Sequence, residues 1–277
     1  MAIPVKALAR RRMGNTAILL AVGFCAFALC YLLGISLRPS AFYSGLVLMA
    51  LVLVLTFFNA RKKLPFLPLV KASHWLQFHI YAGLLSIFLY GIHTSFRVPS
   101  GKLELALGIL FLVVSISGIL GLFITRILPK VMARSGEPLT FEKISAFEVR
   151  LRKQAEELIL SEETKNGTSA LGDAYLHRLS AYFRPRSPFR FFLGNPNRFR
   201  ARALDELRDI DRYTSEEERP VLERMKEMIE AKHNLDVQKS CQFFLRCWLF
   251  VHIPFTYSMV CVALVHAWAA FNYTTSR

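Results

Sequence analysis

Residues 75–96 read WLQFHIYAGLLSIFLYGIHTSF, an apolar stretch that contains His79 and His93. The two histidines are fourteen residues apart. At about 100° per residue, this separation returns a helix to nearly the same face. A second apolar stretch carries His252 and His266 at the same separation. At a rise of about 1.5 Å per residue, the members of each pair lie about 21 Å apart along a helix axis. Two such helices side by side predict two opposed histidine pairs, one near each membrane surface.

The composition is that of a membrane protein. Hydrophobic residues make up 53% of the 277 residues, and the mean hydropathy is +0.35. A helix needs about 20 mainly apolar residues to cross a bilayer. Five stretches are long enough, and apart from histidine their cores carry no charge: 16–37, 41–59, 75–96, 105–128 and 241–271. We therefore predict an all-α protein, a polytopic membrane helical bundle of five spans with a helical cytoplasmic insertion before the last span.

The basic residues predict the orientation, because short cytoplasmic loops carry an excess of Lys and Arg. One side of the predicted bundle has Lys6, Arg10–Arg12, Arg61–Lys63, Lys71, Arg126, Lys130 and Arg134. The other side has only Arg38, Arg97, Lys102 and Arg277. We expect a multi-pass protein of the cell (inner) membrane with a cytoplasmic N-terminus. The net charge of +15 then reflects topology and anionic lipid, and no nucleic-acid partner is expected.

Three parts are expected along the chain. Residues 1–128 form a four-span bundle with the first histidine helix, 129–240 a cytoplasmic helical insertion, and 241–277 the fifth span with the second histidine helix. Apolar spacing in the insertion predicts amphipathic helices over 141–160, 170–183, 203–213 and 216–232, the last of them ended by Asn234. Neither a GxGxxG unit between a strand and a helix nor a P-loop occurs, so no nucleotide-binding domain is expected.

Arginine and phenylalanine alternate within residues 183–200, which read FRPRSPFRFFLGNPNRFR. Three interpretations fit this pattern. The segment is a membrane-surface element with rings in the interface and guanidinium groups on phosphates, a partner-binding loop, or a solvated loop with a few buried rings.

The histidines inside the spans have two interpretations. Histidine within a span is usually functional, but it also forms hydrogen bonds between helices. Two matched pairs favour haem ligation, since other metals would require carboxylates or thiolates beside the histidines. His74 is about 140° around the helix from His79 and is expected at the interface, or as a quinone or propionate contact. His177 and His233 are expected on the surface of the insertion.

The tryptophans indicate how the histidines pair. Trp75 and Trp248 each lie four residues before a histidine, and tryptophan favours the membrane interface. His79 and His252 are therefore predicted to hold an inner haem iron, and His93 and His266 an outer one.

Smaller roles follow for residues near these histidines. Gly83, one turn after His79, would leave room for a porphyrin face, and Arg97, one turn after His93, would meet an outer propionate. Inner propionates would meet Lys71, Lys239 or Arg246, and each of these cations has an alternative role as a lipid-facing anchor. Three further glycines would allow close packing of haem or helices: Gly91, Gly118 and Gly121.

The sequence His79-Ile80-Tyr81-Ala82-Gly83 with His93-Thr94, and Val251-His252-Ile253-Pro254 with His266, resembles the di-haem b-type transmembrane cytochromes. It is most similar to the ferric-reductase-like transmembrane domain and more loosely to the quinol-oxidising cytochrome b group. The resemblance covers about 73–128 and 241–271 and implies two haem b groups, held by the four histidines. The related ferric reductases carry a C-terminal flavin and nicotinamide domain, whereas this sequence ends six residues after Phe271. We therefore expect a separate electron donor.

Three functions are compatible with these features. The first is an electron-transfer subunit of an oxidoreductase complex in the respiratory chain. It would carry electrons between a quinone pool or a cytoplasmic donor and an extracytoplasmic partner, such as a c-type cytochrome or an iron–sulfur protein. The second is a transmembrane metalloreductase or oxidase-type haem subunit fed by a separate flavoprotein. The third is an assembly or scaffold protein whose histidines only connect helices.

Overall fold

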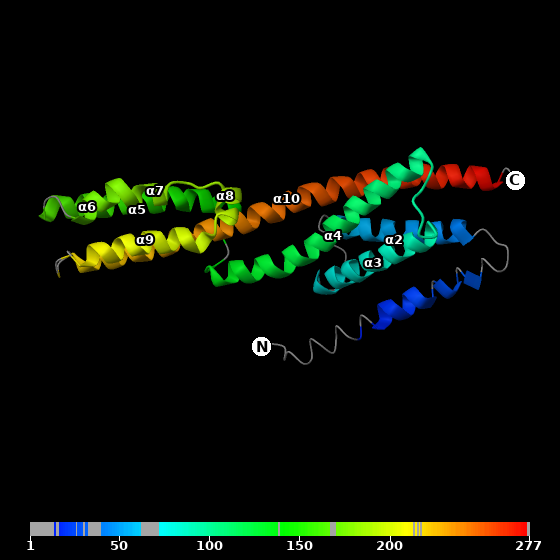
Figure 1. The fold of residues 1–277 in the computed structure, drawn as a ribbon, viewed down its shortest axis with the longest axis horizontal. Coiled ribbons are helices and arrows are strands. Elements are labelled where there is room, and N and C mark those ends of the chain that lie inside the picture. The colour runs from blue at the N-terminus through cyan, green and yellow to red at the C-terminus, as the bar shows by residue number, and fades with distance from the viewer. Residues whose placement is uncertain are drawn as a thin grey trace. The chain divides into compact units, whose positions relative to one another are not determined.

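The computed structural model describes residues 14, 17–25, 27–29, 31–32, 40–61, 72–137, 139–166, 170–212, 214, 216 and 218–275 (Figure 1). Every regular element in these ranges is helical, which confirms the all-α prediction. In chain order the elements are α2 (Ser40–Arg61), α3 (Ala72–His93), α4 (Lys102–Arg134), α5 (Phe141–Asn166), α6 (Ala170–Ala174), the π-helix η1 (Tyr175–Leu179), α7 (Ser180–Phe183), α8 (Pro188–Leu193), α9 (Pro196–Asp211) and α10 (Arg219–Thr275).

The chain divides into two compact units. The first, unit 1, comprises residues 1–122 and 248–277, and the second, unit 2, comprises residues 123–247. Helices α4 and α10 contribute residues to both units. The four histidines of the two matched pairs all belong to unit 1, whereas the segment with alternating arginine and phenylalanine belongs to unit 2.

Three helices are long and apolar enough to cross a membrane: His74–His93, Lys102–Arg134 and Arg219–Asn272. The apolar part of α2, Ala41–Phe57, is shorter. The first predicted span, 16–37, lies partly outside the described residues, and within it 17–25, 27–29 and 31–32 are helical. In α10 the residue Arg246 is the last charged one before the helix ends, so the part that suits a bilayer follows it.

Unit 1 buries small hydroxyl side chains and leaves large apolar ones exposed. Ser44, Ser86 and Ser117 are 3%, 5% and 7% exposed. Each hydroxyl donates to the backbone carbonyl three residues earlier in its own helix, at 2.7–3.0 Å. The buried hydroxyls are therefore satisfied within their helices, as a surrounding without water requires. Unit 1 also buries a small apolar cluster, formed by Leu48, Val52, Leu89, Phe111 and Met259.

Unit 2 has a core of the kind found in water-soluble helical domains. Side chains from α5, α6, η1, α7, α9 and α10 meet in it, and among those no more than 1% exposed are Ala155, Leu171, Leu179, Phe183, Leu207, Leu222, Met225 and Ile229. Helices occur in all four stretches where the apolar spacing predicted them, and α5 and α9 extend beyond the predicted bounds. The periodicity therefore located the helices, whose buried faces supply most of their stability.

The prediction that Asn234 ends a helix is wrong. Helix α10 runs without interruption from Arg219 to Thr275. No glycine or proline stands near Asn234, and Lys232 and Asp236, one on each side of it, form an i,i+4 ion pair within the helix. Continuous backbone bonding and this local pair outweigh the weak preference of a single asparagine for a helix end.

The segment from Phe183 to Arg200 is more ordered than a loop. Phe183 and Phe191 are 0% and 3% exposed, and 188–193 form the short helix α8. The guanidinium carbon of Arg186 lies 4.8 Å from the ring centroid of Tyr182 and 4.5 Å from that of Phe199. Part of the segment is therefore core, which agrees with the buried rings of one interpretation.

The two histidines expected on the surface of the insertion differ. His177 is exposed and lies 3.3 Å from the Asp173 carboxylate, as predicted. His233 is only 7% exposed, and its ring centroid lies 6.0 Å from that of Phe191. The surface prediction is wrong for His233, because α8 covers that face of α10.

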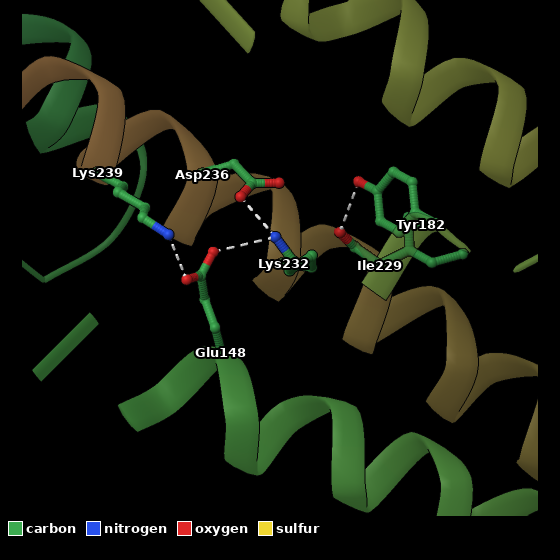
Figure 2. A network of polar contacts seen from close by, with 6 residues as sticks. All are labelled: Glu148, Tyr182, Ile229, Lys232, Asp236 and Lys239. Atoms are coloured by element: carbon green, nitrogen blue, oxygen red, sulfur yellow. Dashed lines mark hydrogen bonds and ion pairs between the residues drawn. The ribbon is translucent and has the colours of Figure 1, made fainter. Parts of the chain in front are cut away.

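A network of buried charges joins α5 to α10 in unit 2 (Figure 2). The Lys232 ammonium group, whose side chain is fully buried, donates to Asp236 Oδ1 at 2.5 Å and to Glu148 Oε1 at 3.2 Å. Lys239 donates to the other oxygen of Glu148 at 2.6 Å. Two cations thus share two carboxylates, so that the buried group of charges is neutral when all four are ionised.

The two carboxyl groups respond differently to this environment. Burial raises the pKa of Asp236 to about 6, although the charge of Lys232 opposes the shift. Burial also acts to raise the pKa of Glu148, but the bonds and charges of Lys239 and Lys232 outweigh it and lower that pKa below its ordinary value. Glu148 is therefore the firmly ionised partner, and Asp236 is the member that accepts a proton first.

Candidate functional site

The four histidines lie on two helices of unit 1, His79 and His93 on α3 and His252 and His266 on α10. All four side chains are partly buried. Their positions on these helices follow from the fourteen-residue separation, which places each pair on one helix face. What the structure adds is the set of neighbours that each ring contacts.

His93 and His266 lie against one another. Their ring centroids are 6.4 Å apart, and the two ring planes are nearly perpendicular, at 81°. A metal–imidazole bond is about 2.0–2.1 Å long, so imidazoles on opposite sides of one metal ion have centroids about 6 Å apart. The separation of these two rings therefore suits a shared iron.

The His93 ring is held from behind by α2. Its Nδ1 lies 3.0 Å from the carbonyl oxygen of Ala41 and 3.3 Å from the hydroxyl of Ser44. A carbonyl only accepts, so Nδ1 carries the proton and Nε2 keeps its lone pair for a metal. A Cβ atom at Gly45 would lie 2.8 Å from the His93 ring, so glycine is needed for this close approach.

His252 is held in the same way by α4. Its Nδ1 lies 2.7 Å from the hydroxyl oxygen of Ser117, which itself donates to the carbonyl of Val114 at 2.9 Å. The serine oxygen therefore accepts from Nδ1, and Nε2 is again the nitrogen with a lone pair. The indole of Trp248 stacks on His252 with centroids 5.5 Å apart and donates to the Ser117 carbonyl at 2.8 Å.

His79 completes the second pair. Its ring is hydrogen-bonded to the backbone of Leu55 in α2, and it lies within electrostatic range of His252. Leu55 and Ala41 are fourteen residues apart, the same separation as the two α3 histidines that they contact. Antiparallel packing of α2 on α3 therefore offers one backbone group to each histidine.

The comparisons identify no relative. Scans against family models, curated proteins and solved structures give no match. The chemistry of the site therefore has to be inferred from its own residues.

The donor set suits haem better than a bare metal ion. Within the residues that the structure describes, no group of three or more His, Cys, Asp or Glu side chains could hold a metal ion. A haem iron needs only two axial ligands from the protein, because the porphyrin supplies the remaining four. His93 and His252, whose Nδ1 atoms are hydrogen-bonded, each offer Nε2 for this purpose. A Cβ at Gly83 would meet nothing within 4 Å, and the role of this glycine beside a porphyrin stays a prediction.

The other predicted contacts have mixed outcomes. Arg97 and His74 are exposed. Lys71 lies outside the described residues. Lys239 and Arg246 were expected near inner propionates. Instead, the structure pairs them with the α5 carboxylates Glu148 and Glu142, at 2.6 and 3.0 Å.

The predicted packing glycines have different neighbours. A Cβ at Gly121 would overlap the indole of Trp248, and one at Gly91 would overlap the ring of Phe96. A Cβ at Gly118 would make an ordinary contact, 3.7 Å from the His252 ring. Gly121 and Gly91 therefore serve the packing of aromatic rings on helices.

The sequence did not indicate the groups behind the histidines. Ser44 and Ser117 are ordinary serines in apolar stretches. Every residue has a backbone carbonyl, so the sequence does not indicate that those of Ala41 and Leu55 contact a histidine. The available signal was weak: a hydroxyl within a span usually faces another helix, so these two serines mark inward faces.

Proposed function

We propose that this chain is a di-haem b-type cytochrome subunit that carries electrons across the membrane. The observation that carries the proposal is the pair His93 and His266, whose centroids are 6.4 Å apart, with Nδ1 of His93 bound to a carbonyl. In the proposed form His79 and His252 hold one haem and His93 and His266 the other. Four further features belong to the proposal: five spans, a cytoplasmic N-terminus, residence in the cell membrane, and partner subunits of a redox complex.

The protein groups position the ligands and fix their protonation. Nδ1 of His93 donates to Ala41, and Nδ1 of His252 donates to Ser117, so each imidazole is neutral and offers Nε2. When bound, haem would supply reversible one-electron chemistry at each iron. The separation of His79 from His93 along α3 sets the two sites about 21 Å apart. The apolar helices keep water away from the path between them.

Purified chain and single variants test the proposal. A dithionite-reduced minus oxidised spectrum, with haem quantified per polypeptide, should give two b-type haems. His79→Ala and His252→Ala should each remove the same one, and His93→Ala and His266→Ala the other. His74→Ala is the matched control on α3 and should retain both.

Two results would contradict the proposal. If the chain folds in the membrane without any haem, the histidines serve only contacts between helices. Loss of the same haem from His79→Ala and His93→Ala would show that the ligands pair along one helix rather than across two.

A further inference from the structure

The segment around α8 carries an excess of positive charge that the proposed function does not use. Between Asp173 and Asp205 the chain has no acidic residue and seven arginines: Arg178, Arg184, Arg186, Arg190, Arg198, Arg200 and Arg202. Two of these have carboxylate partners elsewhere in unit 2, Arg178 with Glu206 at 2.8 Å and Arg200 with Glu230 at 3.2 Å. In the described part of the chain, the other five arginines form no ion pair with a carboxylate.

Three exposed arginines lie in or near α8, and a fourth, Arg202, is exposed farther along α9. Arg184, Arg190 and Arg198 are exposed, and in the described part of the chain none of them forms an ion pair. Arg186 differs, because it lies over the rings of Tyr182 and Phe199. Arg190 lies within α8, and Arg184 and Arg198 lie on either side of it in the sequence. Their three guanidinium groups are therefore available to an external anion.

The position of α8 along α10 suggests what that anion is. The side chain of Phe189 in α8 is 52% exposed, and its ring centroid lies 6.3 Å from that of Phe244 in α10. Phe244 stands two residues before Arg246, after which α10 carries no charged residue up to Thr275. The exposed ring of α8 is therefore held at the level where α10 changes from charged to apolar.

The first turn of α5 lies at the same level. The guanidinium carbon of Arg246 is 4.2 Å from the ring centroid of Phe141, and its Nη2 donates to Glu142 at 3.0 Å. This end of unit 2 thus has aromatic side chains from α5, α8 and α10 beside exposed arginines. Aromatic rings and arginines together are the groups that a membrane interface accepts.

We propose that the surface formed by Arg184, Phe189, Arg190 and Arg198 binds the anionic phospholipid headgroups of the leaflet into which α10 passes. Phe189 inserts between headgroups, and the three guanidinium groups contact phosphates, to which arginine donates in bidentate fashion. The proposal rests on the apolar part of α10 crossing the membrane and does not depend on haem. It selects the membrane-surface interpretation of this segment over a protein partner.

Hydrogen–deuterium exchange on the full chain in nanodiscs tests this assignment. Peptides covering 184–198 should exchange at least about tenfold more slowly in discs that contain phosphatidylglycerol than in discs of phosphatidylcholine alone, and high salt should abolish the difference. The triple variant Arg184→Gln, Arg190→Gln and Arg198→Gln should lose this protection. Peptides covering the core residues Leu207 and Ile210 report whether unit 2 remains folded.

Matched variants distinguish an effect of this particular surface from an effect of the total charge or of any exposed apolar side chain. Lys153→Gln, Arg208→Gln and Arg212→Gln together remove the same charge from other exposed positions and should keep the protection. Phe189→Ala should weaken it, whereas Leu176→Ala, which removes another exposed apolar side chain, should not.

Two outcomes would overturn the proposal. One is equal protection in both kinds of disc. The other is protection that occurs only in native membranes, with other proteins present, which would assign the surface to a protein partner.

Discussion

The two units of this chain expose different kinds of side chain. In unit 1, a serine such as Ser44 is as buried as an apolar residue such as Leu89, at 3% exposed each, whereas Phe250 is 79% exposed. In unit 2, apolar side chains such as Leu207 are fully buried, and the exposed residues include many Arg, Lys and Glu. Exposed apolar side chains suit a lipid surrounding, and exposed charged side chains suit water. The reason is that water drives apolar side chains into the interior, whereas lipid does not.

The difference extends to how buried polar groups are treated. Unit 1 uses neutral hydroxyls that bond to their own helix and then contact a histidine. Unit 2 buries Glu148, Lys232 and Asp236 and balances their charges together with that of the partly buried Lys239. A hydroxyl suits a helix that must remain stable in lipid, whereas a buried ion pair is stable only while both of its partners are present.

The largest effect is expected from breaking the charge network of unit 2. Lys232→Met leaves Glu148 and Asp236 buried without their shared cation and should destabilise unit 2 by about 3–5 kcal/mol. Hydrogen exchange of the slowest amides of α9 measures the change. Adding Glu148→Gln and Asp236→Asn to the same chain should restore much of the loss, because no unpaired carboxylate then remains. A loss that the triple variant does not reduce would mean that packing of the lysine stem, and not its charge, stabilises unit 2.

A smaller effect is expected from a single methyl group in unit 1. Gly121→Ala places a Cβ in the space of the Trp248 indole, displaces the ring and breaks its bond to the Ser117 carbonyl. Overpacking of this kind costs about 1–3 kcal/mol and lowers the thermal unfolding midpoint in detergent. Gly118→Ala, one turn earlier on α4, makes only an ordinary contact and is the control. Equal midpoints for the two variants would contradict the packing of Trp248 on α4.

The smallest effect is a pH dependence confined to unit 2. The pKa of Asp236 is raised from its ordinary 3.8 to about 6, so the folded state holds this proton more tightly than the unfolded one. The resulting stabilisation is present at low pH and is lost as pH rises through 6, by about 1 kcal/mol between pH 5 and pH 7. Glu148 acts in the opposite sense, and its contribution is lost only as pH falls below 4.5.

Asp236→Asn isolates this contribution. The unfolding free energy of unit 2 in the variant should be flatter between pH 5 and pH 7 than in the parent chain, when both are followed by the exchange of α9 amides. Equal slopes for the variant and the parent chain over this range would contradict the titration of Asp236.

Some of this molecule was determined by the sequence alone. Hydrophobic length and periodicity located helices α3, α4 and α5, because burial of one helix face or immersion in lipid requires a pattern that is visible residue by residue. The fourteen-residue separation placed His79 and His93 on one helix face, and likewise His252 and His266, because helix geometry is fixed. Haem ligation by these residues remains a prediction.

Only the tertiary structure decided which groups meet. The carbonyl of Ala41 behind His93, the hydroxyl of Ser117 behind His252, and the burial of His233 beneath α8 depend on contacts between segments far apart in the chain. Asn234 does not end α10, because the local preference of one asparagine is only about a few tenths of a kcal/mol and the helix continues through it with the Lys232–Asp236 pair. Sequence periodicity indicates which face of a helix is buried, but the identity of the side chain opposite that face depends on the register in which two helices pack.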